Sequence, residues 1–265
     1  MDGVLTNLGG LLSSLSSYIM AKSEQKIFGV HPVLEALEAG QPVEKILVRK
    51  GKEHARIQDI RRIAREEGIP VQEVPDEKLD RLSKQGHHQG VLAIAAAVGY
   101  HDLEATILKV QEKVDNPLLV MLDGVTDVRN FGAIARTAEA MGAQALVVPA
   151  KGSAALNGDA MRTSAGALNH LPVCRINHLV DAVIMMHAYG IRTVGCTEKA
   201  EDSLIELDLT GPLCLVMGSE ERGIHRQLLR RLDLQGKIPL QGQVESLNVS
   251  VAAGMAMMEI FRQRG

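Results

Sequence analysis

Apolar residues in the first hundred positions alternate between the spacing of strands and the spacing of helices. Short apolar runs predict β-strands over residues 44–48, 70–74 and 91–98. Helical spacing followed by a glycine predicts helices over 31–39 and 54–67, the second with Ile57, Ile60 and Ile63 on its inner face. Pro75 and Asp76 predict the start of a further helix. These elements predict a small mixed α/β domain over residues 23–100.

From about residue 116 the apolar runs become continuous, as in a parallel sheet that is covered on both faces. The predicted strands are 117–122, 143–148, 191–195 and 213–217, and the predicted helices are 132–141, 178–187, 225–232 and 247–262. This doubly wound α/β pattern predicts a second domain over 116–265, whose ligands would bind at the carboxyl ends of the strands. Residues 101–115 are the expected linker, within which 103–110 has the amphipathic pattern of a helix.

The first 22 residues carry scattered leucines among serines. They lack the positive start and long apolar run of a signal peptide and the roughly 20 apolar residues of a membrane span. We therefore expect a poorly ordered extension, no membrane association and a cytoplasmic location. The three cysteines, Cys174, Cys196 and Cys214, fit no metal-binding spacing, so we expect buried, reduced thiols and no metal site.

Composition limits the kind of nucleic-acid contact that we expect. Aromatic residues make up 2% of the 265 residues, which argues against an aromatic platform for single strands. The net charge of −3 does not indicate nucleic-acid binding, yet residues 45–65 hold eight basic residues against Glu53 and Asp59. This segment is either a solvated helix face or a face that binds RNA.

A first polar block follows a predicted strand at residues 122–138. Asn130 is expected to cap the next helix through its side chain. Arg129 and Arg136 would lie near the start of that helix, where the dipole already favours anions. A surface salt bridge and an anionic partner such as phosphate are both consistent with these arginines, and we favour the anion.

Two further blocks follow later strands. In 215–224 a buried strand leads into Gly218 and Gly223, with no dinucleotide fingerprint and no P-loop lysine, which disfavours oxidoreductases and nucleotide triphosphates. In 237–250 either Ser246 or Asn248 is expected to cap the last helix, and together with Ser250 they are more polar groups than one cap requires.

In this order, the three blocks resemble the SpoU/TrmH family (SPOUT superfamily) of RNA 2′-O-ribose methyltransferases. The resemblance rests on Asn-x-Gly-Ala-x-x-Arg-Thr-Ala, Gly-x-Glu-x-x-Gly and Ser-Leu-Asn-Val-Ser, and it covers about residues 118–264. The first domain, with Phe28-Gly-Val-His-Pro and His88-Gln-Gly-Val, is similar to the small ribosomal-protein-like domain of the RlmB-type branch. Members of that branch methylate a guanosine ribose of large-subunit ribosomal RNA.

The resemblance implies an α/β-knot domain with a deep trefoil knot, preceded by an α/β substrate-binding domain. It implies S-adenosyl-L-methionine as cofactor, RNA as partner and a homodimer with each site near the interface. The implied cofactor-binding residues are Gly218, Ile238 and Leu247, with Thr197 nearby. The implied catalytic residues are Arg136, Asn130, Glu220, Ser246 and Asn248. The sequence departs from the family at Glu221, where Gly is usual, and at Val128, where Pro is frequent.

The expected mechanism needs no metal, because the methyl donor is already activated as a sulfonium. Arg136 would stabilise charge on the ribose 2′-oxygen rather than act as a base, since its pKa is above about 12. Asn130 would orient Arg136 or the ribose, and the first domain would bind RNA through 45–65 and the His87-His88-Gln89 loop. Transfer RNA methylation and an RNA-binding protein that has lost its cofactor, a reading to which Glu221 gives weight, remain alternatives.

Overall fold

The computed structural model describes residues 26–51, 55–84, 86–244 and 246–265, so the expected extension lies outside the described residues. The chain divides into two compact units, which are treated separately below. The first comprises the described residues up to Val98 with Leu156–Asp159, and the second comprises Gly99–Ala155 and Ala160–Gly265.

The first unit is a four-stranded sheet with helices on both faces. Its strands are β1 (Lys26–Phe28), β2 (Val43–Arg49), β3 (Val71–Val74) and β4 (Val91–Ala95), in the order β1-β4-β2-β3. Its helices are α2 (Val30–Glu38), α3 (Ala55–Glu66) and α4 (Asp76–Ser83). The predicted elements are confirmed to within a few residues, whereas β1 was missed because three residues carry no readable period.

The two faces of this sheet follow the alternation of side chains along β2. Ile46 and Val48 join the core under α2 and α3, whereas Leu47 faces the opposite way and packs with Leu79 of α4. Of the three isoleucines predicted to be buried on α3, Ile57 and Ile60 are buried and Ile63 is only partly so.

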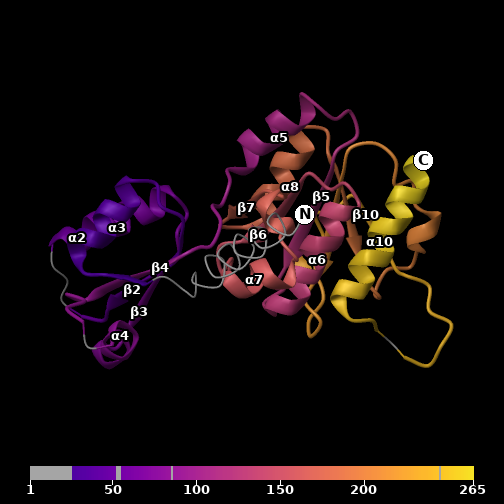
Figure 1. Cartoon of the computed structure of the whole chain (residues 1–265). Helices are drawn as coiled ribbons and strands as arrows, with labels where there is room; N and C mark the ends of the chain where they lie inside the picture. The colour runs from indigo at the N-terminus through magenta and orange to yellow at the C-terminus, as the bar shows by residue number, and fades with distance from the viewer. Residues whose placement is uncertain (1–25, 52–54, 85, 245) are drawn as a thin grey trace, which may run out of the picture. The chain divides into compact units, whose positions relative to one another are not determined.

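The second unit is a parallel sheet of six strands in the order β10-β8-β9-β5-β6-β7 (Figure 1). The strands are β5 (Leu118–Asp123), β6 (Ala145–Pro149), β7 (Val173–Ile176), β8 (Arg192–Cys196), β9 (Leu213–Gly218) and β10 (Leu234–Gly236). The helices are α5 (Leu103–Gln111), α6 (Val128–Ala140), α7 (Gly158–Thr163), α8 (Leu179–Ala188), α9 (Arg226–Leu229) and α10 (Val249–Arg264), with 3-10 turns at Ala167–Asn169 and Leu204–Glu206. The short elements β7, β10 and α7 were not predicted, and α9 is half as long as expected.

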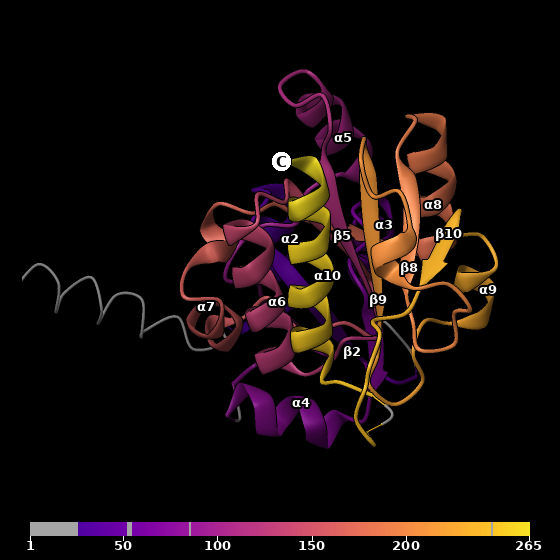
Figure 2. The same ribbon diagram turned by 90° about the vertical axis from the view of Figure 1, so that its right-hand side faces the viewer.

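Helices α6 and α10 lie side by side on one face of this sheet (Figure 2), and α5 and α8 cover the other. The central strand β9 is buried at every position and its neighbours β5 and β6 at all but the last, as predicted for a parallel sheet, whereas β7, β8 and β10 are partly exposed. Cys174 and Cys214 are buried in this core, as expected, and burial raises the pKa of the Cys174 thiol to about 11. Cys196 is partly buried.

The strand register aligns the carboxyl ends of four strands at one edge of the sheet. Cys196 of β8 pairs with Met217 of β9 on one side and with Gly236 of β10 on the other, and Gly218 of β9 pairs with Asp123 of β5. The loops that follow these strands therefore begin side by side, at the edge where ligands of parallel sheets bind. No helix in the described part of the chain is both long and apolar enough to cross a membrane.

Candidate functional site

Helix α6 begins within the first polar block, and its N-cap residue is Asp127. The Asp127 Oδ1 atom accepts hydrogen bonds from the backbone N–H groups of Arg129 and Asn130, both at 2.9 Å. The expectation that Asn130 caps this helix is therefore wrong, because the helix starts earlier than predicted and Asn130 already lies in its first turn. Its side chain is consequently free for other contacts.

Helix α10 begins within the third block and is capped by Asn248, one of the two caps that the sequence predicted. The Asn248 Oδ1 atom accepts from the backbone N–H of Ser250 at 3.0 Å and of Val251 at 3.4 Å, and from the Ser250 hydroxyl. These donors fix the orientation of the amide, since a flipped amide would turn two N–H hydrogens toward them. The Nδ2 group must therefore point to the other side.

On that other side, the three sequence blocks meet. Asn248 Nδ2 donates to Asn130 Oδ1 at 3.0 Å and to Glu220 Oε1 at 2.5 Å, and Glu220 Oε1 also accepts from the Val249 backbone N–H at 3.3 Å. We call Asn130, Glu220 and Asn248 the amide network. Because Asn130 Oδ1 is used as an acceptor, its own two N–H hydrogens point away from Asn248. Asn130 is partly buried, so these donors lie at a surface that a ligand can reach.

The loop after β9 carries Glu220 and folds back on itself. Ser219 and Gly223 exchange backbone hydrogen bonds of 3.2 and 2.8 Å. A Cβ atom on Gly218 would lie 2.1 Å from the Gly223 carbonyl carbon, so glycine is required there by the loop's own packing. Glu221 is exposed and its φ is not positive, which means that the glycine usual in the family is not needed for the backbone at this position.

Arg136 lies away from the amide network within this chain. It is the ninth residue of α6, so the expectation that it occupies the first turn is wrong. Arg136 lies six positions after Asn130. The two residues are therefore about 9 Å apart along the helix axis and about 120° apart around it. Both Arg136 and Arg129 are exposed, and neither forms an ion pair with a residue that the structure describes, so the salt-bridge interpretation lacks support.

The expected cofactor residues lie at the carboxyl edge of the sheet. Thr197 directly follows β8, is buried, and donates its backbone N–H to the Gly236 carbonyl at 3.0 Å. Ile238 follows β10 by one residue, and partly buried Leu247 directly precedes the cap of α10. Ser246 is exposed and makes no hydrogen bond to a described residue, so it is, like Arg136, an expected site residue outside the amide network.

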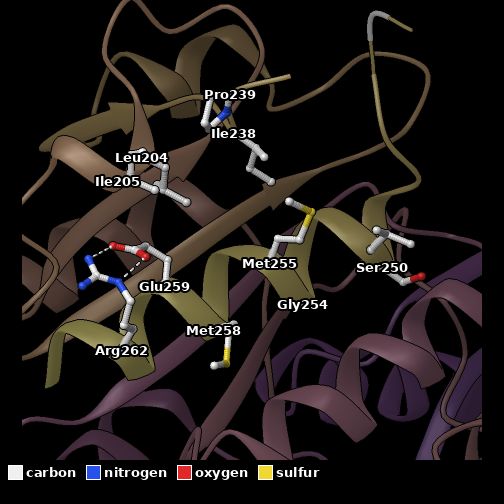
Figure 3. Close-up of a pocket in the computed structure, with 11 residues that line it drawn as sticks. Leu204, Ile205, Ile238, Pro239, Ser250, Gly254, Met255, Met258, Glu259 and Arg262 are labelled. Carbon is white, nitrogen blue, oxygen red and sulfur yellow. Dashed lines mark hydrogen bonds and ion pairs between the residues drawn. The ribbon is translucent and has the colours of Figure 1, made fainter. Parts of the chain in front are cut away.

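A hollow of about 550 Å³ opens along the outer face of α10 (Figure 3). Its walls are mainly apolar: Leu204, Ile205, Ile238 and Pro239 on one side and Val251, Met255 and Met258 on α10. Hydrogen bonds from Arg262 and Gln263 lower the pKa of the Glu259 carboxyl to about 2, which keeps a charged pair at one end. The volume is within the range of about 300–1,000 Å³ for small-molecule sites.

Among the described residues, no group of histidine, cysteine and carboxylate side chains could hold a metal ion.

Comparison with known proteins identifies this arrangement. Residues 117–258 match the model of the SpoU rRNA Methylase family, and residues 26–101 match the model named RNA 2′-O ribose methyltransferase substrate binding. The chain belongs to the SpoU rRNA methylase family. The family resemblance drawn from the three blocks is therefore confirmed.

Three similar proteins of known name cover between 61% and 92% of this chain. A putative TrmH family tRNA/rRNA methyltransferase, YacO, of Bacillus subtilis is 35% identical over 92% of this chain and 98% of its own length. The SpoU methyltransferase AviRb from Streptomyces viridochromogenes, solved in complex with AdoMet, has 26% identity and a TM-score of 0.57, covering 92% of each chain. The A. aeolicus TrmH/SpoU tRNA modifying enzyme has 29% identity and a TM-score of 0.51, over 61% of this chain and 83% of its own.

Two members of the SpoU site were not singled out as site residues from the sequence. Asp127 holds the first turn of α6, and Ser250 donates its hydroxyl to Asn248. An aspartate three positions before Asn130 was a readable capping signal. The sequence did mark Ser250 as a polar group beyond what one cap requires, but its bond to Asn248 depends on the orientation of that amide.

Proposed function

We propose that the protein transfers a methyl group from S-adenosyl-L-methionine to a ribose 2′-hydroxyl of RNA. The observation that carries this proposal is the amide network, in which Asn130, Glu220 and Asn248 from the three SpoU blocks meet at the carboxyl edge of a parallel sheet. The family membership and the solved AdoMet complex of the similar protein AviRb support the choice of cofactor.

The loops after β8, β9 and β10 would hold the cofactor through Thr197, Gly218, Ile238 and Leu247. The aligned register brings the first three of these residues to one edge of the sheet, beside the loop that carries Glu220. When bound, S-adenosylmethionine supplies a methyl group that is already activated as a sulfonium. Glu221 does not argue against binding, because its backbone does not need a glycine.

The chain's own residues would prepare the 2′-hydroxyl, which is a poor nucleophile near neutral pH. Asn130 presents two N–H donors that can hold the ribose oxygen or a neighbouring phosphate. Arg136 would stabilise negative charge, since a guanidinium gives up its proton only at high pH. Glu220 and Asn248 would act through Asn130, and Ser246 would line the entrance beside them.

A homodimer would cover the outer face of α10. Val251, Met255, Met258 and Phe261 follow helical spacing there and are 46–53% exposed; we call them the apolar stripe. An exposed apolar stripe on a helix indicates an interface. Because α6 packs beside α10, a partner subunit on the stripe would lie next to Arg136 and would place each site near the interface.

The trefoil knot is part of the same proposal. The chain passes from β8 to β9, crosses over β8 to β10, and then returns to place α10 beside α6. This path supports a C-terminal segment that threads through an earlier loop. We further propose that the protein is cytoplasmic, that residues 23–100 select RNA and that residues 116–265 carry the reaction. The expected linker contains α5, whose Leu103 and Ile107 belong to the core of the second unit.

A guanosine of large-subunit ribosomal RNA, as in the RlmB-type branch, is the proposed target. Transfer RNA is the second candidate, favoured by the names of the relatives. Purified ribosomal and transfer RNAs incubated with the protein and labelled S-adenosylmethionine separate the two. We expect label in the large ribosomal RNA; label in transfer RNA alone would favour the alternative. Calorimetric titration with the cofactor alone tests the remaining alternative, an RNA-binding protein of this fold that has lost its cofactor; absence of binding would favour that alternative.

A further inference from the structure

The helices that follow the neighbouring strands β5 and β9 lie on opposite faces of the sheet. Helix α6, which follows β5, packs beside α10, whereas α9, which follows β9, contacts α8. Where the loops after two neighbouring parallel strands diverge in this way, α/β sheets bind their ligands at the carboxyl ends of the strands. Asp123, the last residue of β5, joins the two diverging loops through its side chain.

The Asp123 carboxylate holds the first residue of α9. Its Oδ2 atom accepts a hydrogen bond from the backbone N–H of His225 at 2.6 Å, across 102 residues of sequence. His225 is the N-cap residue of α9, so this N–H has no partner within the helix. A hydrogen bond with an ionised acceptor is roughly twice as strong as a neutral one. The bond therefore ties the end of β5 to the start of α9.

The loop that carries Glu220 ends at His225, and it also touches the residue that follows Asp123. A Cβ atom on Gly124 would lie 3.4 Å from the Cβ atom of Ser219, which places the end of β5 against the start of this loop. From the same loop, Glu220 extends to the start of α10 and joins the amide network. The end of β5 thus supports the loop from which Glu220 reaches the network.

Other hydrogen bonds of this loop are internal to it. Ser219 and Gly223 exchange backbone bonds, and the Ser219 hydroxyl accepts the backbone N–H of Arg222 at 3.2 Å. These bonds fix the shape of the loop, whereas the bond from Asp123 fixes its distance from β5. Because β5 leads directly into the turn before α6, the same bond relates the loop to Asn130.

Building on the proposed function, we propose that Asp123 is a positioning residue for methyl transfer. Its bond to His225 holds the loop that carries Gly218 and Glu220 at the distance from α6 that the amide network requires. Asp123 acts through this loop and not on the substrate itself. A merely structural bond would raise the unfolding temperature and leave the kinetics of the folded protein unchanged.

The test uses the full chain, ribosomal RNA and labelled S-adenosylmethionine, at a temperature at which every variant is folded. Asp123→Ala should lower kcat about 100-fold, since a displacement of about 1 Å at a site can cost that much. The dissociation constant for S-adenosylmethionine, measured by calorimetry, should rise several-fold. Asp123→Asn keeps an acceptor oxygen for His225, so its kcat should stay within about fivefold of wild type.

Asp208→Ala is the matched control for a lost carboxylate. Asp208 accepts the backbone N–H of Thr210 at 3.0 Å and pairs with Arg192, the first residue of β8, so it lies at the amino edge of the sheet. Its loss should lower the unfolding temperature and leave kcat and cofactor affinity unchanged.

The donor end of the bond gives a second test that leaves Asp123 in place. The φ of His225 is −58°, which proline adopts. His225→Pro removes the N–H, whereas His225→Ala keeps it and removes only the imidazole. We expect kcat to fall in His225→Pro and to stay near wild type in His225→Ala. In the double variant of Asp123→Ala and His225→Pro, the two losses should not add, because both remove the same bond.

Wild-type kcat and cofactor affinity in folded Asp123→Ala would overturn the positioning role and leave the proposed function intact. Equal kcat values in His225→Pro and His225→Ala would overturn it as well, and these two variants decide the question if Asp123→Ala does not fold. A wild type that neither binds S-adenosylmethionine nor methylates RNA would instead overturn the proposed function, and the role of Asp123 with it.

Discussion

Asn248 and Asn130 are joined by a hydrogen bond of 3.0 Å, from Nδ2 to Oδ1, across 118 residues of sequence. The same Nδ2 group donates to Glu220, while the Asn248 oxygen caps α10. One side chain thus fixes the start of a helix and the orientation of the Asn130 amide.

Replacing Asn248 with aspartate tests that orientation. Asn248→Asp keeps an oxygen for the cap but turns a second oxygen toward Asn130, whose amide should then flip and withdraw its donors from substrate. We expect kcat for methyl transfer to fall about 100-fold, a usual cost of losing one such donor, and the unfolding temperature to fall as well, because the new carboxylate oxygen faces Glu220. Asn248→Ser keeps a capping oxygen without the added charge, so its kcat should fall less than that of Asn248→Asp. An unchanged kcat in Asn248→Asp would contradict the role of the network.

Arg136 is predicted to contribute charge stabilisation. Arg136→Ala should lower kcat roughly 100- to 1,000-fold while circular dichroism and the unfolding temperature stay as in wild type. Arg129→Ala is the matched control, since it removes an exposed arginine from the same face of α6. Full methyl transfer by folded Arg136→Ala would remove this residue from the mechanism.

The apolar stripe is predicted to be the subunit interface. Met258→Lys places a charge at its centre and should raise the dimer dissociation constant about 100-fold, as loss of a central interface contact does. Ile184→Lys, on α8 at the opposite face and 55% exposed, should leave the dimer intact. Sedimentation equilibrium measures both, and a monomeric wild type would refute the interface.

Gly218 is predicted to be indispensable for the loop that carries Glu220. Gly218→Ala places a Cβ 2.1 Å from Gly223 and should cost roughly 1–3 kcal/mol of unfolding free energy as the loop is displaced. Gly242→Ala has no atom within 4 Å of its new Cβ and should be nearly neutral. Chemical denaturation compares the two, and equal stabilities would show that the loop yields without cost.

Acid should weaken the second unit through Asp233. Burial raises the pKa of the Asp233 carboxyl, but hydrogen bonds from the Thr193 N–H and hydroxyl and the neighbouring His187 outweigh burial and lower it from 3.8. A depressed folded pKa contributes stability above the unfolded value, which is lost as the pH falls further. Asp233→Asn should therefore be less stable than wild type by roughly 1 kcal/mol near neutral pH. Denaturation curves measured below pH 3.8 should show the difference shrinking, and a constant difference would exclude this linkage.

The sequence predicted the long elements well, because burial imprints a period on them. The apolar strand over 213–217 and the last helix, predicted over 247–262, are examples. Strands β1 and β10 were missed because each has three residues, too few for a period, and exists through pairing with a distant strand.

The sequence could name candidate site residues, but it could not predict how they are arranged. Motif order identified Asn130, Glu220 and Asn248, but only the fold brings them into contact, since no local pattern encodes a bond between two helix starts. The start of α6 was placed too late, and this one error misassigned the cap to Asn130 and moved Arg136 toward the helix start.

The most direct test of the central claim is the chemical position of the transferred methyl group. Ribosomal RNA is incubated with the full chain and labelled S-adenosylmethionine, and then hydrolysed completely in alkali. Methylation of a ribose 2′-oxygen removes the group that attacks the neighbouring phosphodiester, so the account predicts label in alkali-resistant dinucleotides. Label in mononucleotides would assign the methyl group to a base, and absence of label from RNA would contradict methyl transfer itself.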